Sequence, residues 1–236
     1  MLHSKIYLKV KAIIFDMDGV ITNTMPDHYR VWQTIFKSEG SRVSHLDVYS
    51  REGQKGIDSV KEIFTARNKD FSIKKARIIL KRKESLFKKI VKRRFIPGTR
   101  RFLRRLHAQG FQLALVTGTS RHELHRILPE NLFKLFQITV TGSDIRNGKP
   151  HPAPFLKALK LMKLKSPEVV VIENAPFGIR SAKAAGLRCL AVETSLPRNY
   201  LKGSDFVFSS IRELENKVIF ALPKPITPKV VNHKNF

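Results

Sequence analysis

Two carboxylates stand close together after an apolar run near the start of the chain. Residues 12–15 (AIIF) are followed by Asp16 and Asp18, with Gly19 next. An apolar run that stops at a glycine-containing turn predicts a buried strand ending in a tight loop. An ionised carboxylate is a nucleophile without losing a proton, and a second one nearby can carry protons. Asp16 and Asp18 are therefore candidate catalytic residues, although an isolated D-x-D-G fits a plain turn equally well.

Two later segments carry groups that suit a phosphate. LVTGTS ends an apolar run at Thr117, Gly118 and Thr119, which offer hydroxyl and main-chain N–H donors. In GKPHPAPF, Lys149 is framed by a glycine and a proline, and a fixed cation there can neutralise a transferring phosphoryl group and the carboxylate attacking it. Each segment alone is also explained by a loop or by a surface lysine.

A third segment carries oxygen ligands for a cation. Glu173 and Asn174 follow four apolar residues, VVVI, at the end of the most strongly apolar run in the chain. A polar pair in such a place needs a partner, and a hard cation such as Mg²⁺ prefers oxygen ligands.

The elements that hold these segments alternate between apolar runs and helical patterns. Such alternation predicts βαβ units and a parallel sheet, so the expected fold class is α/β, with a Rossmann-like parallel sheet flanked by helices. In open α/β sheets ligands bind at the carboxyl ends of the strands. The expected strands are 12–15, 113–116, 138–140, 169–172 and 190–192.

Almost a hundred residues separate the first two strands, far more than one crossover requires. Apolar residues at helical spacing predict helices over 28–39, 59–66 and 74–92, and another over 99–107 leads back to the sheet. We therefore expect a catalytic core of residues 1–22 and 95–210, an inserted helical cap of 23–94, and a C-terminal segment of 211–236 with a helix and a disordered, proline-rich tail.

Composition and charge limit the remaining possibilities. The 236 residues are 42% hydrophobic and 27% charged, as in ordinary globular proteins. The single cysteine, Cys189, lies in an apolar run and is expected to be a buried core residue. We find neither a signal-peptide pattern nor a membrane-spanning apolar stretch, which favours a cytoplasmic protein, and the sequence leaves open a monomer or a dimer.

The formal net charge of +26 would attract polyanions. Fifteen Lys or Arg residues and one acid, Glu84, lie between Lys74 and Arg105. A solvated helical surface is the favoured interpretation, because no nucleic-acid-binding motif accompanies the charge.

The order of the motifs resembles the haloacid dehalogenase superfamily from about residue 11 to residue 194. D-x-D-G-V, the strand ending in Thr117, Gly-Lys-Pro and the Glu173-Asn174 pair follow one another at similar spacings. Within that superfamily the chain resembles the branch with a small helical cap, which contains phosphoglycolate-type phosphatases, sugar-phosphate phosphatases and β-phosphoglucomutase.

The resemblance implies a mechanism and a set of site residues. Asp16 would attack phosphorus to give a phospho-aspartate, Asp18 would serve as general acid and base, and Mg²⁺ would be the cofactor. A small phosphorylated metabolite would be the substrate. The implied sites are catalytic Asp16, Asp18, Thr117 and Lys149, substrate-binding Gly118, Thr119, His28, Arg51 and Lys83, and metal-binding Asp16, the Asp18 main chain, Glu173 and Asn174.

One residue departs from the family pattern, and one segment leaves two functions open within the family. The family usually has an aspartate where this chain has Asn174, which removes one negative charge from the metal site. The segment GVITNTMPDHYRVW, with His28 and Trp32, is similar to the start of β-phosphoglucomutase. The segment Ser50-Arg51-Glu52 and Lys83 align with its cap residues only through gaps. A phosphatase is favoured, a sugar-phosphate mutase is the alternative, and a degraded member that binds nucleic acid through its basic cap is the least favoured.

Overall fold

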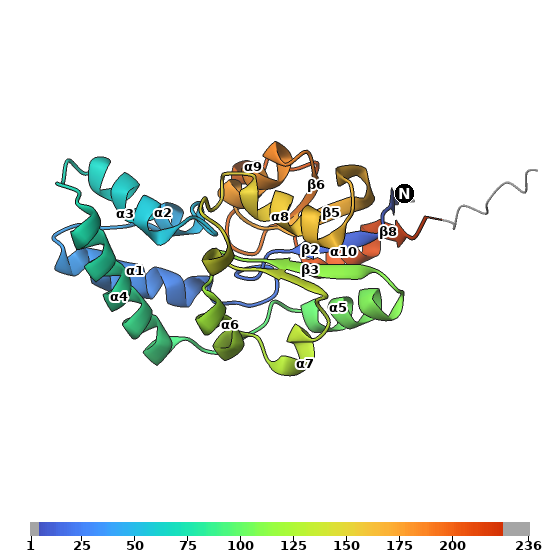
Figure 1. Ribbon diagram of the computed structural model, residues 1–236, viewed down its shortest axis with the longest axis horizontal. Coiled ribbons are helices and arrows are strands. Elements are labelled where there is room, and N and C mark those ends of the chain that lie inside the picture. Colours follow the sequence, from blue (N-terminus) through green and yellow to red (C-terminus); the bar gives the residue numbers. More distant parts are fainter. Residues whose placement is uncertain (1–4, 224–236) are drawn as a thin grey trace, which may run out of the picture.

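A six-stranded parallel sheet forms the centre of the molecule (Figure 1). The computed structural model describes residues 5–223, and in it the strand order is β4-β3-β2-β5-β6-β7. The five predicted strands and the α/β class are confirmed, and β7 is a strand that the sequence analysis did not predict. The bounds are β2 Ala12–Phe15, β3 Gln112–Val116, β4 Ile138–Val140, β5 Val169–Glu173, β6 Arg188–Val192 and β7 Phe206–Phe208.

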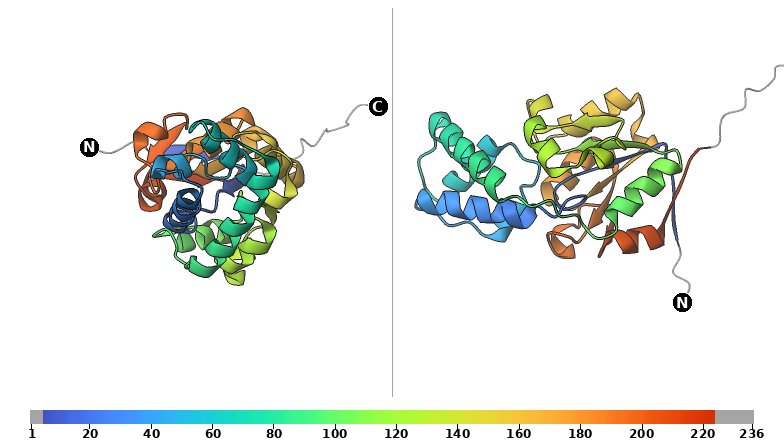
Figure 2. Two further views of the ribbon diagram at one scale, coloured as in Figure 1. Left: turned by 90° about the vertical axis from the view of Figure 1, so that its left-hand side faces the viewer. Right: turned by 90° about the horizontal axis from the view of Figure 1, so that it is seen from below.

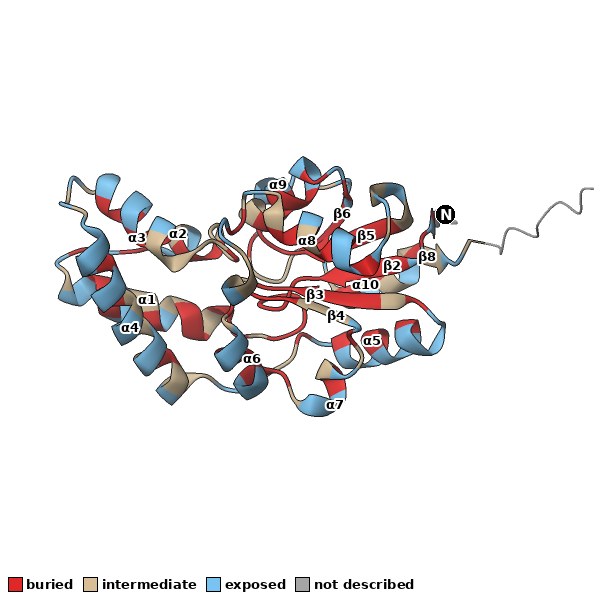
Figure 3. Ribbon diagram, in the orientation of Figure 1, coloured by how far each residue is buried: buried red, intermediate tan, exposed pale blue. Residues whose placement is uncertain are grey.

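Helices cover both faces of the sheet (Figure 3). The residues of β2 alternate between the hydrophobic clusters on the two faces. Phe15 belongs to the hydrophobic cluster that contains Phe102 of α5, whereas Ile14 belongs to the cluster that contains Phe155 of α8. Cys189 is buried in the second cluster, as expected of a core residue. The helices are α5 Thr99–Ala108, α6 Arg121–Ile127, α7 Glu130–Phe133, α8 Ala153–Met162, α9 Pro176–Ala184 and α10 Ile211–Lys217.

Four helices between β2 and α5 form a separate group at one end of the molecule (Figure 2). We call them the cap helices. Three correspond to the predicted helices, and their apolar faces meet one another through buried residues such as Phe36 and Phe64. The short α2 was not predicted; its first turn is fixed by reciprocal hydrogen bonds between Ser44 and Asp47. The bounds are α1 Met25–Ser38, α2 His45–Tyr49, α3 Gly56–Thr65 and α4 Ile73–Ile90.

The C-terminal segment contains more regular structure than the sequence predicts. The predicted helix is present as α10, but β8, Val218–Ala221, follows it and pairs in parallel with β1, Ile6–Lys9. The sequence analysis did not predict β8, because this four-residue strand obtains its hydrogen bonds from a partner more than two hundred residues away. Most of the predicted tail, 224–236, lies outside the described residues.

The basic residues between Lys74 and Arg105 lie mostly on the exposed faces of α4 and α5, which confirms the predicted basic helical surface. Some of them form surface ion pairs; both Lys75 and Arg82 contact Glu39. In the described part of the chain no helix has the length and apolar character needed to cross a bilayer.

The chain reverses its direction of travel across the sheet between β2 and β5. From β2 the strands proceed through β3 to β4 on one side, and then through β5, β6 and β7 on the other. Open α/β sheets bind ligands at such a switch point, at the carboxyl ends of the strands. Asp16 directly follows β2, its main-chain N–H donates to the carbonyl of Ile172 (3.0 Å), and Glu173 ends β5.

Candidate active site

Lys149 lies buried between two carboxylates at the switch point. Its Nζ is 2.6 Å from Asp16 Oδ1 and 2.6 Å from Glu173 Oε1. Burial raises the pKa of Asp16 to about 8; Lys149 opposes this effect, and the negative charges of Glu173 and Asp18 add to it. Burial alone would lower the pKa of Lys149, but the two carboxylates raise it above its ordinary value. Lys149 is therefore a permanent cation, and Asp16 needs further positive charge to be fully ionised at neutral pH.

Asp18 lies in a different environment, among hydroxyl groups. Its carboxylate accepts hydrogen bonds from Thr24 and from Thr119 (2.9 Å), and Nε2 of His28 lies 3.6 Å from Oδ1. Burial alone would raise the pKa of Asp18, but His28 and the two hydroxyls lower it below its ordinary value. These contacts favour the ionised form of Asp18, which is the form that a general base requires.

Two buried oxygens of the site have no hydrogen-bond partner among the described residues: Asp16 Oδ2 and Asn174 Oδ1. The amide nitrogen of Asn174 donates to Ser195 Oγ (2.7 Å), which fixes the orientation of the amide. Leaving such groups unpaired is costly, and a hard cation satisfies carboxylate and amide oxygens. The residues present therefore fit a Mg²⁺ ion.

Glu173 is less available as a metal ligand, because both of its carboxylate oxygens already have partners. One carboxylate oxygen contacts Lys149, and the other accepts from the main-chain N–H groups of Asn174 (2.8 Å) and Ala175 (3.2 Å). Within residues 5–223 no three His, Cys, Asp or Glu side chains are grouped as a metal site. The candidate set differs from such a group because it relies on Asn174 and a main-chain carbonyl.

We expect Asn174→Asp to tighten Mg²⁺ binding. The substitution adds a negative charge to an oxygen that has no partner, and closer charge balance with a divalent cation should lower the Mg²⁺ concentration for half-maximal activity by about tenfold. Asn131→Asp adds the same charge on exposed α7 and should leave that concentration unchanged. Equal half-saturation in the two variants would remove Asn174 from the metal site.

The loop between α2 and α3 closes over this site. The carbonyl of Gly53 accepts from the main-chain N–H of Lys149 (3.2 Å), and a Cβ at Gly53 would overlap the Lys149 side chain. A Cβ at Gly118 would come within 2.6 Å of Gly53 Cα. Gly118, predicted to bind substrate, therefore permits close approach of the loop to the core. Because Asp16, Asp18 and Lys149 are at most 1% exposed, this arrangement is a closed one.

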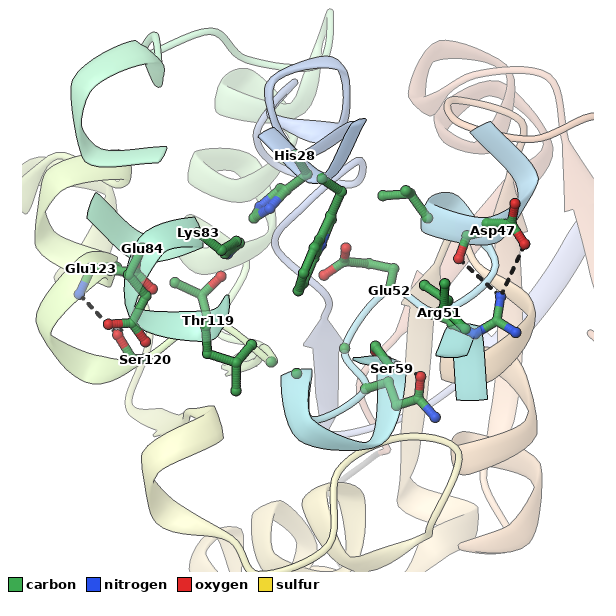
Figure 4. A pocket seen from close by; sticks show the side chains of 18 residues that line it. His28, Asp47, Arg51, Glu52, Ser59, Lys83, Glu84, Thr119, Ser120 and Glu123 are labelled. Atoms are coloured by element: carbon green, nitrogen blue, oxygen red, sulfur yellow. Dashed lines mark hydrogen bonds and ion pairs between the residues drawn. The ribbon is translucent and has the colours of Figure 1, made fainter. Parts of the chain in front are cut away.

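A pocket of about 170 Å³ lies between the cap helices and the core (Figure 4). It is lined by all three predicted cap residues, His28, Arg51 and Lys83, and by the predicted residues Gly118 and Thr119. We call it the substrate pocket. His28 stacks on Phe87 with a centroid separation of 4.2 Å.

The two predicted cations of this pocket differ in availability. Arg51 donates through Nε to Glu62 (3.1 Å) and through Nη1 to the carbonyl of Asp47 (2.9 Å). Lys83 forms no ion pair with any described residue, and its Nζ lies 4.7 Å from the centre of the Phe87 ring. Thr117, predicted to hold the phosphoryl group, is buried, and its hydroxyl accepts from the main-chain N–H of Thr119 (3.0 Å).

The predicted site residues do not include three side chains near the site: Thr24, Glu52 and Glu123. Thr24 and Glu52 carry no local signal, because their position depends on how the cap helices meet the core. Burial and the negative charges of Asp18 and Asp16 raise the pKa of Glu52 well above its ordinary value. Glu123 stands three residues after Ser120, a spacing that normally indicates a helix cap.

Comparisons with known proteins agree with this geometry. A family model described as haloacid dehalogenase-like hydrolase matches residues 13–192. The phosphorylated carbohydrates phosphatase of Thermotoga maritima is 29% identical over 182 residues, which cover 75% of this chain and 82% of that protein. Hexitol phosphatase A of Escherichia coli is 26% identical, with 88% and 94% covered.

Solved structures show the same fold. One from Bacteroides vulgatus, provisionally named a β-phosphoglucomutase, has a TM-score of 0.79 and 31% identity, covering 89% of this chain and 88% of that one. A β-phosphoglucomutase from Clostridium difficile has a TM-score of 0.74 at 23% identity, with 88% and 96% covered. The resemblance found in the sequence is thus confirmed: the chain belongs to the haloacid dehalogenase-like hydrolase family and is a phosphohydrolase.

Proposed function

We propose that this protein is a magnesium-dependent phosphatase that acts on a phosphorylated carbohydrate through a phospho-aspartate intermediate. The observation that carries the proposal is the buried Lys149 between Asp16 and Glu173, at the switch point of the sheet. A fixed cation beside a carboxylate can offset the repulsion between that carboxylate and a phosphate. The names of the Thermotoga and Escherichia relatives support the substrate class.

In this mechanism Asp16 is the nucleophile. One of its carboxylate oxygens forms a bond to phosphorus, and the bond from phosphorus to the alcohol oxygen of the substrate breaks. Lys149 neutralises charge on the carboxylate and on the phosphoryl oxygens, and Thr117, Gly118 and Thr119 offer further donors. A Mg²⁺ ion held by Asp16, the Asp18 carbonyl, Glu173 and Asn174 would supply positive charge that favours the ionised form of Asp16 and offsets phosphate repulsion.

Asp18 is proposed to transfer protons in both half-reactions. In its ionised form it can accept a proton from the water that attacks the phospho-aspartate, which releases phosphate and restores Asp16. The first half-reaction needs the protonated form, which donates to the departing alcohol oxygen. Because hydroxyl groups of Thr24 and Thr119 stabilise the ionised form, substrate binding must change these contacts before Asp18 can act as an acid.

We propose that residues 23–94 act as a cap that opens for substrate and closes for catalysis. The tight contacts of Gly53 with Lys149 and Gly118 support a closed arrangement that excludes bulk water. Entry of a substrate then requires the cap helices to move away from the core. The cap also determines which part of the substrate lies next to the phosphoryl group.

The main alternative is a sugar-phosphate mutase, which the Bacteroides structure favours by its name. A mutase must hold a second phosphate while a bisphosphate turns over. Arg51 and Lys83 are the residues expected to do so. Arg51 is already paired with acidic residues, so Lys83 remains as the available cation among the described residues that line the substrate pocket.

We therefore expect β-glucose 1-phosphate, supplied with Mg²⁺ and a catalytic amount of glucose 1,6-bisphosphate, to yield mainly inorganic phosphate. A coupled assay for glucose 6-phosphate, run beside a phosphate assay, measures both products. The mutase assignment would replace the phosphatase assignment if glucose 6-phosphate formed faster than inorganic phosphate.

A further inference from the structure

The substrate pocket is acidic, although the chain as a whole carries a net charge of +26. Arg51 is engaged with Glu62 and with Asp47, and Asp47 also contacts Arg67 at 2.8 Å. If the paired residues Arg51 and Asp47 are left out, one basic and three acidic side chains line the pocket. The remaining ionisable residues that line the pocket are Lys83, Glu52, Glu84 and Glu123, and the negative charge comes from Glu84 and Glu123 because the pKa of Glu52 is raised. A local negative charge of this kind repels a second anionic group on a substrate.

Glu123 lines this pocket and has an unsatisfied hydrogen-bonding atom. Its side chain is buried, with 5% of the residue exposed, and Oε1 has no partner among the described residues. The other oxygen accepts from Ser120 Oγ (3.1 Å), which fixes the carboxylate in place. A buried carboxylate oxygen without a donor is costly, so a molecule that brings a donor into the pocket is favoured.

Donors and acceptors lie on both walls of the pocket (Figure 4). Glu84 and Glu123 come from α4 and α6, and Glu52 comes from the loop before α3. Lys83 also lines the pocket and can donate hydrogen bonds to the oxygens of a neutral ligand, whereas the hydroxyl of Ser120 already donates to Glu123. This mixture suits hydroxyl groups, which donate and accept at the same atom.

We propose that Glu123 is a specificity-determining residue, and that it accepts a hydrogen bond from an uncharged, polyhydroxylated leaving group. A substrate with a bare alkyl chain would leave Glu123 without a donor. One with a carboxylate or a second phosphate would place an anion beside Glu84 and Glu123. The inference rests on the proposed phosphatase activity and narrows its substrates to monophosphates of polyols and neutral sugars.

Three compounds with the same six-carbon chain test the inference. Sorbitol 6-phosphate carries hydroxyls, hexyl phosphate carries none, and 6-phosphogluconate adds a carboxylate. We expect kcat/KM of the wild type to be highest for sorbitol 6-phosphate. Glu123→Gln should lower the ratio of kcat/KM for sorbitol 6-phosphate to that for hexyl phosphate by about tenfold, because a neutral amide accepts more weakly than a carboxylate.

The design keeps a folding defect apart from a specificity change. A ratio of two kcat/KM values does not depend on the fraction of folded enzyme. Glu130→Gln makes the same substitution at an exposed position of α7, and the ratio of kcat/KM for sorbitol 6-phosphate to that for hexyl phosphate should stay at its wild-type value in this variant. Equal turnover of the three compounds by the wild type would overturn the inference, as would an unchanged ratio of kcat/KM for sorbitol 6-phosphate to that for hexyl phosphate in Glu123→Gln. Either result would leave the proposed phosphatase activity standing. If neither these compounds nor p-nitrophenyl phosphate were hydrolysed with Mg²⁺, the phosphatase proposal would fail, and this inference with it.

Discussion

Asp16→Asn should abolish phosphate release, with a loss of about 10⁴-fold or more in kcat and a retained fold. The amide is a far weaker nucleophile than the carboxylate, and loss of a group that forms the covalent intermediate removes the main route of the reaction. The fold should survive because Asp16 is buried with a raised pKa, so a neutral side chain of the same size does not add an unpaired charge. Phosphate release from p-nitrophenyl phosphate under saturating Mg²⁺ measures the effect.

Asp70→Asn is the matched control, since it makes the same change on an exposed loop and should keep full activity. Circular dichroism and thermal unfolding of both variants show whether the fold is intact. Activity of Asp16→Asn within tenfold of the wild type would exclude Asp16 as the nucleophile.

Lys149→Met should remove both activity and a large part of the stability. The substitution keeps an aliphatic chain but leaves Asp16 and Glu173 buried without their cation, and loss of one partner from a buried ion pair typically costs about 3–5 kcal/mol. The deficit should be larger at pH 8 than at pH 5. A carboxyl group whose pKa is raised by folding is tolerated while protonated and destabilises the fold as pH rises through that pKa.

Denaturant unfolding at the two pH values, without divalent cation, measures this deficit. Lys160→Met makes the same substitution on the exposed side of α8 and should change the free energy of unfolding by less than about 0.5 kcal/mol. A deficit in Lys149→Met that does not change with pH would show that the carboxylates are not held by Lys149.

The sequence predicted the sheet because each central strand is apolar on both faces. Two of these strands are buried along their whole length, Val169 to Ile172 and Ala12 to Phe15. A continuous apolar run of this kind can be recognised in the amino-acid sequence alone. The strands β1 and β8 escaped prediction since Tyr7, Lys9 and Ala221 are exposed, and their pairing joins the two ends of the described chain.

The site residues also differ in how far the sequence could predict them. Asp16, Lys149 and Glu173 each follow or flank a recognisable element, and the sheet brings them together. Glu52 and Glu123 meet only when the cap helices are placed against the core, so their shared pocket could not be predicted from local patterns. The predicted role of Arg51 likewise stays a prediction, and its pairing with Glu62 and Asp47 makes a phosphate contact less favourable.

The central claim is that Asp16 carries the phosphoryl group during turnover, and trapping that species tests it directly. Asp18→Asn should accumulate it with p-nitrophenyl phosphate and Mg²⁺, because nitrophenolate leaves without a proton while attack by water has lost its base. Acid quenching, borohydride reduction and peptide mass spectrometry should then find homoserine at position 16, and none in the Asp16→Asn/Asp18→Asn double variant. An unmodified Asp16 accompanied by a stoichiometric burst of nitrophenolate would contradict the account.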